Sequence, residues 1–96
     1  MPLHTNNKIK TVTTREYYHK YEVDIWYASE YDYGLPTLTF NYLEDATNYF
    51  NKALATLLEN AECRRATIRL SLLTSSNSNF ERSIGTGIKT CEIREE

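Results

Sequence analysis

The sequence predicts a two-layer α+β domain with the element order ββαββ, an antiparallel sheet of about four strands and one helix packed on one face. Apolar and aromatic residues alternate with period two before residue 42 and after residue 65, and they repeat with period 3.6 between these segments. Chains shorter than about 250 residues rarely divide, so 96 residues indicate one core. We therefore expect a single domain over residues 1–96, with residues 1–8 as a flexible N-terminal arm.

The first strand is expected over residues 17–31, where the odd positions carry most of the apolar and aromatic side chains. Trp26 falls on the even positions with Tyr18 and therefore lies on the opposite face. Residues 8–14 either prolong this strand or form an arm. A turn with Asp32, Gly34 and Pro36 leads to a second strand over residues 37–42, which completes an antiparallel hairpin.

A helix is expected to begin near residue 43, because apolar residues then recur at helical spacing over about four turns. Either Asn41 and Glu44 form a capping box, or the helix starts at residues 42–43 with two acidic residues in its first turn. The basic pair Arg64-Arg65 suits its C-terminal end. The stripe is made by Ala46, Tyr49, Phe50, Ala53, Leu54, Leu57, Leu58 and Ala61.

Two further strands are expected after the helix. Residues 66–73 alternate with their even face apolar, and the polar run 74–79 is the most loop-like stretch. Over residues 84–94 the apolar positions change parity across Gly85 and Gly87, which indicates a β-bulge or bend. This parity also divides the tyrosines: Tyr17, Tyr21, Tyr27, Tyr42 and Tyr49 are expected in the core, and Tyr18, Tyr31 and Tyr33 on a recognition surface with Trp26.

Charge is distributed unevenly along the chain. The formal net charge is +3 over residues 1–20, −7 over residues 21–62 and +2 over residues 63–96, which gives −2 in total. An acidic middle segment repels phosphate, so nucleic acid is an unfavoured partner. No apolar run approaches the length of about 20 residues that crosses a membrane, and no secretory signal is evident at the N-terminus, so we expect a cytoplasmic protein without a membrane partner.

The main candidate site is the sheet face that one helix cannot cover. Trp26 and Tyr18 lie on that face, and Arg69 joins them if the odd residues of the third strand share it. Trp, Tyr and Arg are enriched at interface hot spots, so we expect this face to dock another protein or a second copy of the chain. The alternative is that the arm or a bulge buries Trp26.

A second candidate site is the acidic, tyrosine-rich tip of the first hairpin, with Tyr27, Tyr31, Tyr33, Glu30 and Asp32. Tyrosine combines a large apolar body with a polar end, and the acids would favour a basic partner. Ordinary hairpin packing explains the same residues about equally well. The spacing lacks the further ligands of a calcium loop, so we expect no metal site here.

Catalytic motifs and cofactor fingerprints are absent from the sequence. His4 and His19 are the only histidines, and Cys63 and Cys91 are isolated thiols with no CxxC spacing. A disulfide between the two cysteines stays open. We expect no enzyme, no cofactor and no metal ion.

Two functions follow from these observations. The first is a small non-catalytic protein-interaction module that binds a protein target or forms a homodimer through the open sheet face or an edge strand. The second is a platform for a small ligand, nucleotide or single-stranded nucleic acid, with Trp26 and Tyr18 stacking on bases and Arg69 or Lys20 contacting phosphate. In size and composition the chain is similar to small phage or mobile-element proteins that inhibit a host protein by occupying its surface.

Overall fold

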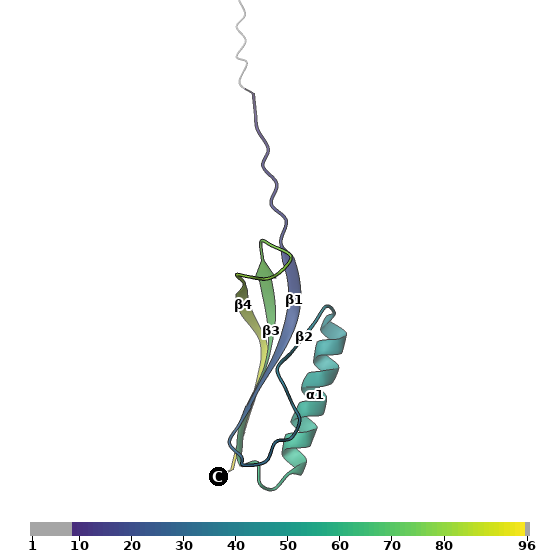
Figure 1. Cartoon of the computed structure of the whole chain (residues 1–96), viewed down its shortest axis with the longest axis vertical. Helices are drawn as coiled ribbons and strands as arrows, with labels where there is room; N and C mark the ends of the chain where they lie inside the picture. The colour runs from purple at the N-terminus through teal and green to yellow at the C-terminus, as the bar shows by residue number, and fades with distance from the viewer. Residues whose placement is uncertain (1–8, 96) are drawn as a thin grey trace, which may run out of the picture.

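A computed structural model describes residues 9–95 of the protein (Figure 1). Its elements are β1 (Tyr18–Tyr27), β2 (Leu38–Phe40), α1 (Leu43–Glu59), β3 (Arg65–Ser75) and β4 (Ile84–Arg94). The order ββαββ, the antiparallel pairing of all four strands and the single helix on one face confirm the predicted α+β fold. The arm predicted over residues 1–8 lies outside the described residues.

The four strands lie in the order β2-β1-β3-β4, so β1 and β3 are central and β2 and β4 form the edges. β1 pairs with β3 along its whole length, from Tyr18 opposite Ser75 to Tyr27 opposite Ala66. β2 adds three residues to the other side of β1. Figure 1 shows that the sheet extends beyond α1 at the end where the N-terminal segment leaves it.

α1 forms because its apolar side chains recur on one face, and four of them are buried against the sheet: Ala46, Phe50, Ala53 and Leu57. The expected stripe is too long at its end, because Leu58 is exposed and Ala61 lies beyond the helix. The predicted capping box is wrong, since Tyr42 caps the helix in an extended conformation without a side-chain hydrogen bond. Glu44 and Asp45 occupy the first turn, where carboxylates interact favourably with the helix dipole. The basic pair lies beyond the helix end at Glu59; Arg64 instead forms an ion pair with Glu95 over 3.3 Å.

The core lies between α1 and the covered sheet face. Val23, Ile68 and Leu57 are fully buried there, and burying such a side chain stabilises the fold by about 1.5–3 kcal/mol. The predicted core positions of Tyr17 and Tyr42 are wrong, because these residues are 52% and 70% exposed. Tyr17 precedes β1, at the end of the sheet that extends beyond α1, and Tyr42 stands just outside the first helical turn.

β4 carries the bulge that its glycines predicted. Its register against β3 shifts between Leu70 and Ser71, where Lys89 and Gly87 are the partners and Ile88 is left over. The loop predicted over residues 74–79 begins later, because β3 continues to Ser75. The hydroxyl of Ser75 is buried and donates to the carbonyl oxygen of Arg82 over 2.6 Å, which closes the connection to β4.

Candidate functional site: the open face of the sheet

The sheet face opposite α1 is built from alternate residues of all four strands, because cross-strand partners share a face; β2 contributes Thr39, opposite Glu22. Register places Trp26 opposite Thr67, Asp24 opposite Arg69 and Glu22 opposite Ser71. β4 continues these rows with Glu92, Thr90 and Gly87. We call this surface the open face.

Trp26 is the most prominent aromatic residue of the open face. Its side chain is 56% exposed, although β1 holds its backbone in a ladder with β3. It borders a hollow of about 500 Å³ lined by residues 25–27, Asp32 and 34–37. On its other side lies a hollow of about 150 Å³ that includes Arg65 and Arg94. Trp26 is therefore an exposed ring between two depressions, on a strand that is paired along its whole length with β3.

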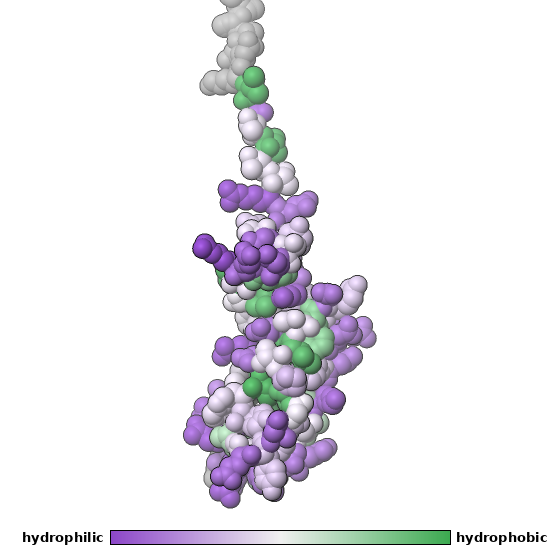
Figure 2. Space-filling model, in the orientation of Figure 1, coloured by the Kyte–Doolittle hydropathy of each residue, from purple (hydrophilic) through white to green (hydrophobic). Residues whose placement is uncertain are grey.

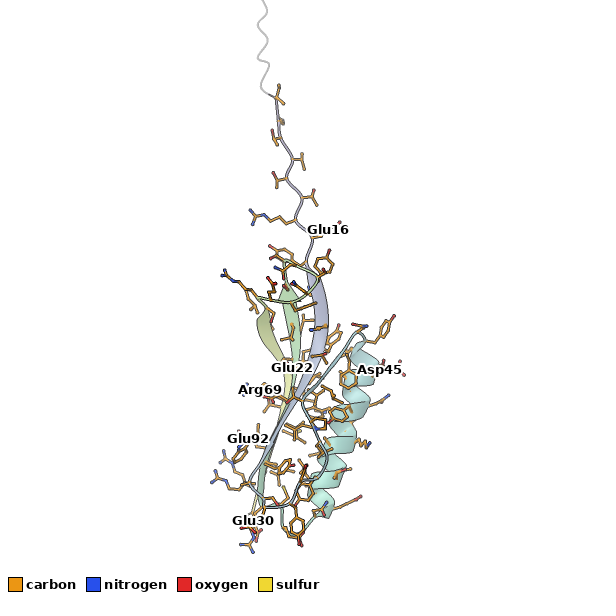
Figure 3. All side chains as sticks on the ribbon, in the orientation of Figure 1. Glu16, Glu22, Glu30, Asp45, Arg69 and Glu92 are labelled. Carbon is orange, nitrogen blue, oxygen red and sulfur yellow. The ribbon has the colours of Figure 1, made fainter. Side chains whose placement is uncertain are left out.

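The middle of the open face is polar and hollowed. Arg69 lines a depression of about 320 Å³ together with Glu22 and Asp24, and its floor includes Gly85 and Gly87. No ion pair of Arg69 is present within residues 9–95. Figure 3 shows Glu22, Arg69 and Glu92 following one another along the sheet, with α1 on the other side.

Tyr18 lies at the far end of β1 from Trp26. They are eight positions apart, and a strand rises about 3.3 Å per residue, so the two residues are about 26 Å apart. Near the Tyr18 end, the Lys20 ammonium lies 4.3 Å from the centroid of the Phe80 ring. Tyr18, Arg69 and Trp26 therefore share one face but form three separate areas rather than one cluster.

The segment 28–37, which we call the tyrosine loop, is organised by its own side chains. The Tyr27 hydroxyl donates to Asp32 Oδ1 over 3.3 Å and accepts the backbone N–H of Tyr33 over 3.1 Å. Asp32 Oδ1 also accepts the N–H of Gly34 over 2.8 Å, at a backbone φ of +67° that favours glycine. Asp32 and Tyr33 thus serve the loop's conformation.

Glu30, Tyr31 and Asp32 are exposed, whereas Tyr33 is half-buried. The Tyr31 side chain is 61% exposed and its ring stacks on Tyr33 at 6.4 Å between centroids. The loop is tied to the open face where the Thr37 hydroxyl donates to Asp24 Oδ1 over 2.9 Å. Sequence reasoning did not identify Thr37 or Gly87 as part of the surface, although the shared parity of Gly85 and Gly87 was a signal for the central hollow.

The two cysteines within residues 9–95, Cys63 and Cys91, are both free, so no disulfide joins them. Burial raises the pKa of the Cys63 thiol, and a raised pKa favours the unreactive neutral form. No group of three His, Cys, Asp or Glu side chains in the described part of the chain is placed to hold a metal ion.

Comparison with known proteins gives no match among protein-family models, curated proteins or solved structures. The geometry of the surface is therefore the basis for a functional proposal. In the same residues 9–95, no helix has the length and apolar composition needed to span a membrane.

Proposed function

We propose that the chain is a small non-catalytic protein-interaction module whose open face docks on a partner protein, with Trp26 as the central contact. The observation that supports this most directly is the position of the chain's single tryptophan, more than half exposed on a central strand. Trp residues with this exposure contribute strongly when an interface buries them.

The surroundings of Trp26 suit a protein partner. The hollows on either side of the ring offer space for partner side chains, and aromatic anchors gain most in such packed positions. Arg65 and Arg94 lie on one side, Glu92 pairs with Arg94 over 2.9 Å, and the tyrosine loop lies on the other. A rim of mixed charge around an apolar ring favours a specific protein surface over a uniformly charged polymer.

The alternative function as a nucleic-acid or nucleotide platform has less support from this geometry. Tyr18 and Trp26 are too far apart to stack on neighbouring bases. Glu22 and Asp24 lie between them on the same strand face and would repel a phosphate backbone. Activity as a phage or mobile-element inhibitor stays a prediction from composition.

The experiment that tests the proposal immobilises the protein and measures the partner protein that it captures. The extract is prepared from the source cells and, where these cells have a host, from the host as well. We expect the wild type to capture a partner protein. Trp26→Ala should capture less than half of that amount, with an unchanged circular dichroism spectrum. Leu58→Ala is the matched control, because Leu58 is also a large exposed apolar residue (63%) but lies on α1. Equal capture by Trp26→Ala and wild type would overturn the proposal, as would capture lost equally in both variants.

A further inference from the structure

The open face leaves one long segment of the chain without a role. Residues 9–17, which we call the arm, precede β1, are all exposed and project away from the domain (Figure 1). No backbone hydrogen bond joins the arm to any other residue of 9–95. The arm is therefore an extended segment with all of its hydrogen-bonding groups available.

The arm has the composition of a β-strand. Five of its nine residues are β-branched and none is glycine or proline: Ile9, Thr11, Val12, Thr13 and Thr14 are the β-branched ones. Ile9 and Val12 are almost fully exposed, and Figure 2 shows isolated apolar patches on this projecting segment. Fully extended, nine residues span about 30 Å. Such a segment would form backbone hydrogen bonds and bury its apolar side chains by joining a sheet.

The outer edge of β4 is suited to pair with the arm. β4 pairs with β3 alone, and its residues from Ile84 to Thr90 are all exposed. Eleven residues give it a length of about 36 Å, close to that of the arm. Edge strands are commonly protected by proline, by short length or by projecting lysines. β2, the opposite edge, has three residues, whereas β4 has no proline and its lysine, Lys89, turns toward the Phe50 ring at 5.1 Å.

Strand directions also agree. β1 is antiparallel to β3 and β3 is antiparallel to β4, so β1 and β4 run in the same direction. The arm continues β1. In a dimer whose two-fold axis is perpendicular to the strands, the arm of one copy runs opposite to β4 of the other, which is the antiparallel arrangement of the rest of the sheet.

We propose that two copies of this chain exchange arms, each arm pairing with the β4 edge of the other copy as a fifth strand. Each copy supplies one arm and one β4 edge. Reciprocal exchange therefore closes the assembly as a dimer and leaves neither β4 edge exposed. Within one copy the arm would have to cross two strands and reverse direction, and it holds no glycine or proline for such a turn. The exchange does not depend on the function proposed for Trp26.

The test is the molar mass of the full chain by light scattering over a concentration series, with Thr13→Pro and Thr13→Ala. We expect the wild type to reach twice the 11.2 kDa chain mass. Proline removes a backbone donor and blocks strand pairing, so Thr13→Pro should raise the dimer Kd by at least about tenfold, while Thr13→Ala should keep the wild-type Kd. Thr13 is exposed, so neither change should affect the monomer fold.

Hydrogen exchange identifies which surfaces pair. Amides of the arm and of β4 should be protected in the dimer and lose protection on dilution. A wild type that stays monomeric overturns the exchange, and so does a dimer that forms equally well with Thr13→Pro. A dimer whose arm amides stay unprotected, as in direct pairing of two β4 edges, also overturns it. Trp26→Ala should dimerise like the wild type, which separates this proposal from the preceding one.

Discussion

The two faces of the same sheet differ in almost every physical respect. The covered face packs Val23 and Ile68 against α1 with no solvent exposure. The open face presents Trp26, Arg69 and a hollow floored by glycines, with side chains that are mostly half-buried or exposed. Alternate residues of one strand thus serve opposite purposes, because successive side chains of a strand point to opposite faces.

This difference means that the binding role proposed for the open face can be tested separately from the stability of the fold. The core contacts lie on one side of β1 and β3, so changes on the other side leave those contacts intact. The comparison can be challenged at both faces, beginning with the position where the largest change in the free energy of unfolding is expected.

Truncation of Phe50 should cause the largest loss, because its ring is 1% exposed in the centre of the core. We expect Phe50→Ala to lower the free energy of unfolding by about 3–5 kcal/mol in urea titrations. Leu58→Ala, on the solvent side of the same helix, should change it by no more than about 0.5 kcal/mol. Similar losses in the two variants would mean that α1 does not pack against the sheet through its four buried residues.

Ser75 belongs to the open-face rows by register but is buried, so it tests whether a residue of this face can also contribute to stability. It lies opposite Tyr18 but is 3% exposed, and its hydroxyl donates to the Arg82 carbonyl oxygen and accepts the N–H of Asn77. Ser75→Ala leaves these groups unpaired and should cost about 1–3 kcal/mol in the same titration. Ser76→Ala, at an exposed neighbour, serves as the control and should be near neutral.

Two glycines should respond in opposite ways to the same change. A Cβ on either Gly34 or Gly87 meets no atom within 4 Å, so packing does not distinguish them. Gly34 has a φ of +67°, and Gly34→Ala should lower the free energy of unfolding by about 1–2 kcal/mol. Gly87 lies in β4, and Gly87→Ala should raise it by about 0.5–1 kcal/mol. Equal shifts in thermal midpoint would contradict this assignment.

The free energy of unfolding should fall at alkaline pH because of two groups on the covered side. Burial raises the pKa of the Cys63 thiol and of the Tyr49 hydroxyl, so the folded state binds these protons more tightly than the unfolded chain. Stability should therefore be constant up to the ordinary thiol pKa of about 8.5 and fall as pH rises toward the raised folded pKa. Urea titrations from neutral to alkaline pH measure this slope. Cys63→Ala should reduce the fall in the free energy of unfolding that begins near the ordinary thiol pKa. An unchanged fall would mean that groups other than Cys63 cause it.

The smallest effect is expected at the centre of the open face. Arg69 is exposed and makes no ion pair within residues 9–95, so Arg69→Ala should change the free energy of unfolding by no more than about 0.5 kcal/mol. A loss above 1 kcal/mol would show that the open face contributes to the core after all, and would remove the separation between the faces.

Much of the fold was predictable from the sequence because each element has a clear period. The helical stripe gave the helix start near residue 43, and the parity of Trp26 gave its face. Tyr17 and Tyr42 were misplaced because parity says nothing about where the covering helix begins. The distance between Tyr18 and Trp26 follows from strand rise alone, whereas the Tyr27–Asp32–Tyr33 network depends on how the chain reverses between two strands.

The position of the single tryptophan has a practical consequence. The chain holds eight tyrosines but one indole, and that indole stands in solvent on the open face. Its emission therefore reports from one known place on the surface, without a dye or an engineered label. A shift of that emission toward shorter wavelength on mixing with another molecule would locate the contact at Trp26, and collisional quenching by iodide would measure how much of the ring stays accessible.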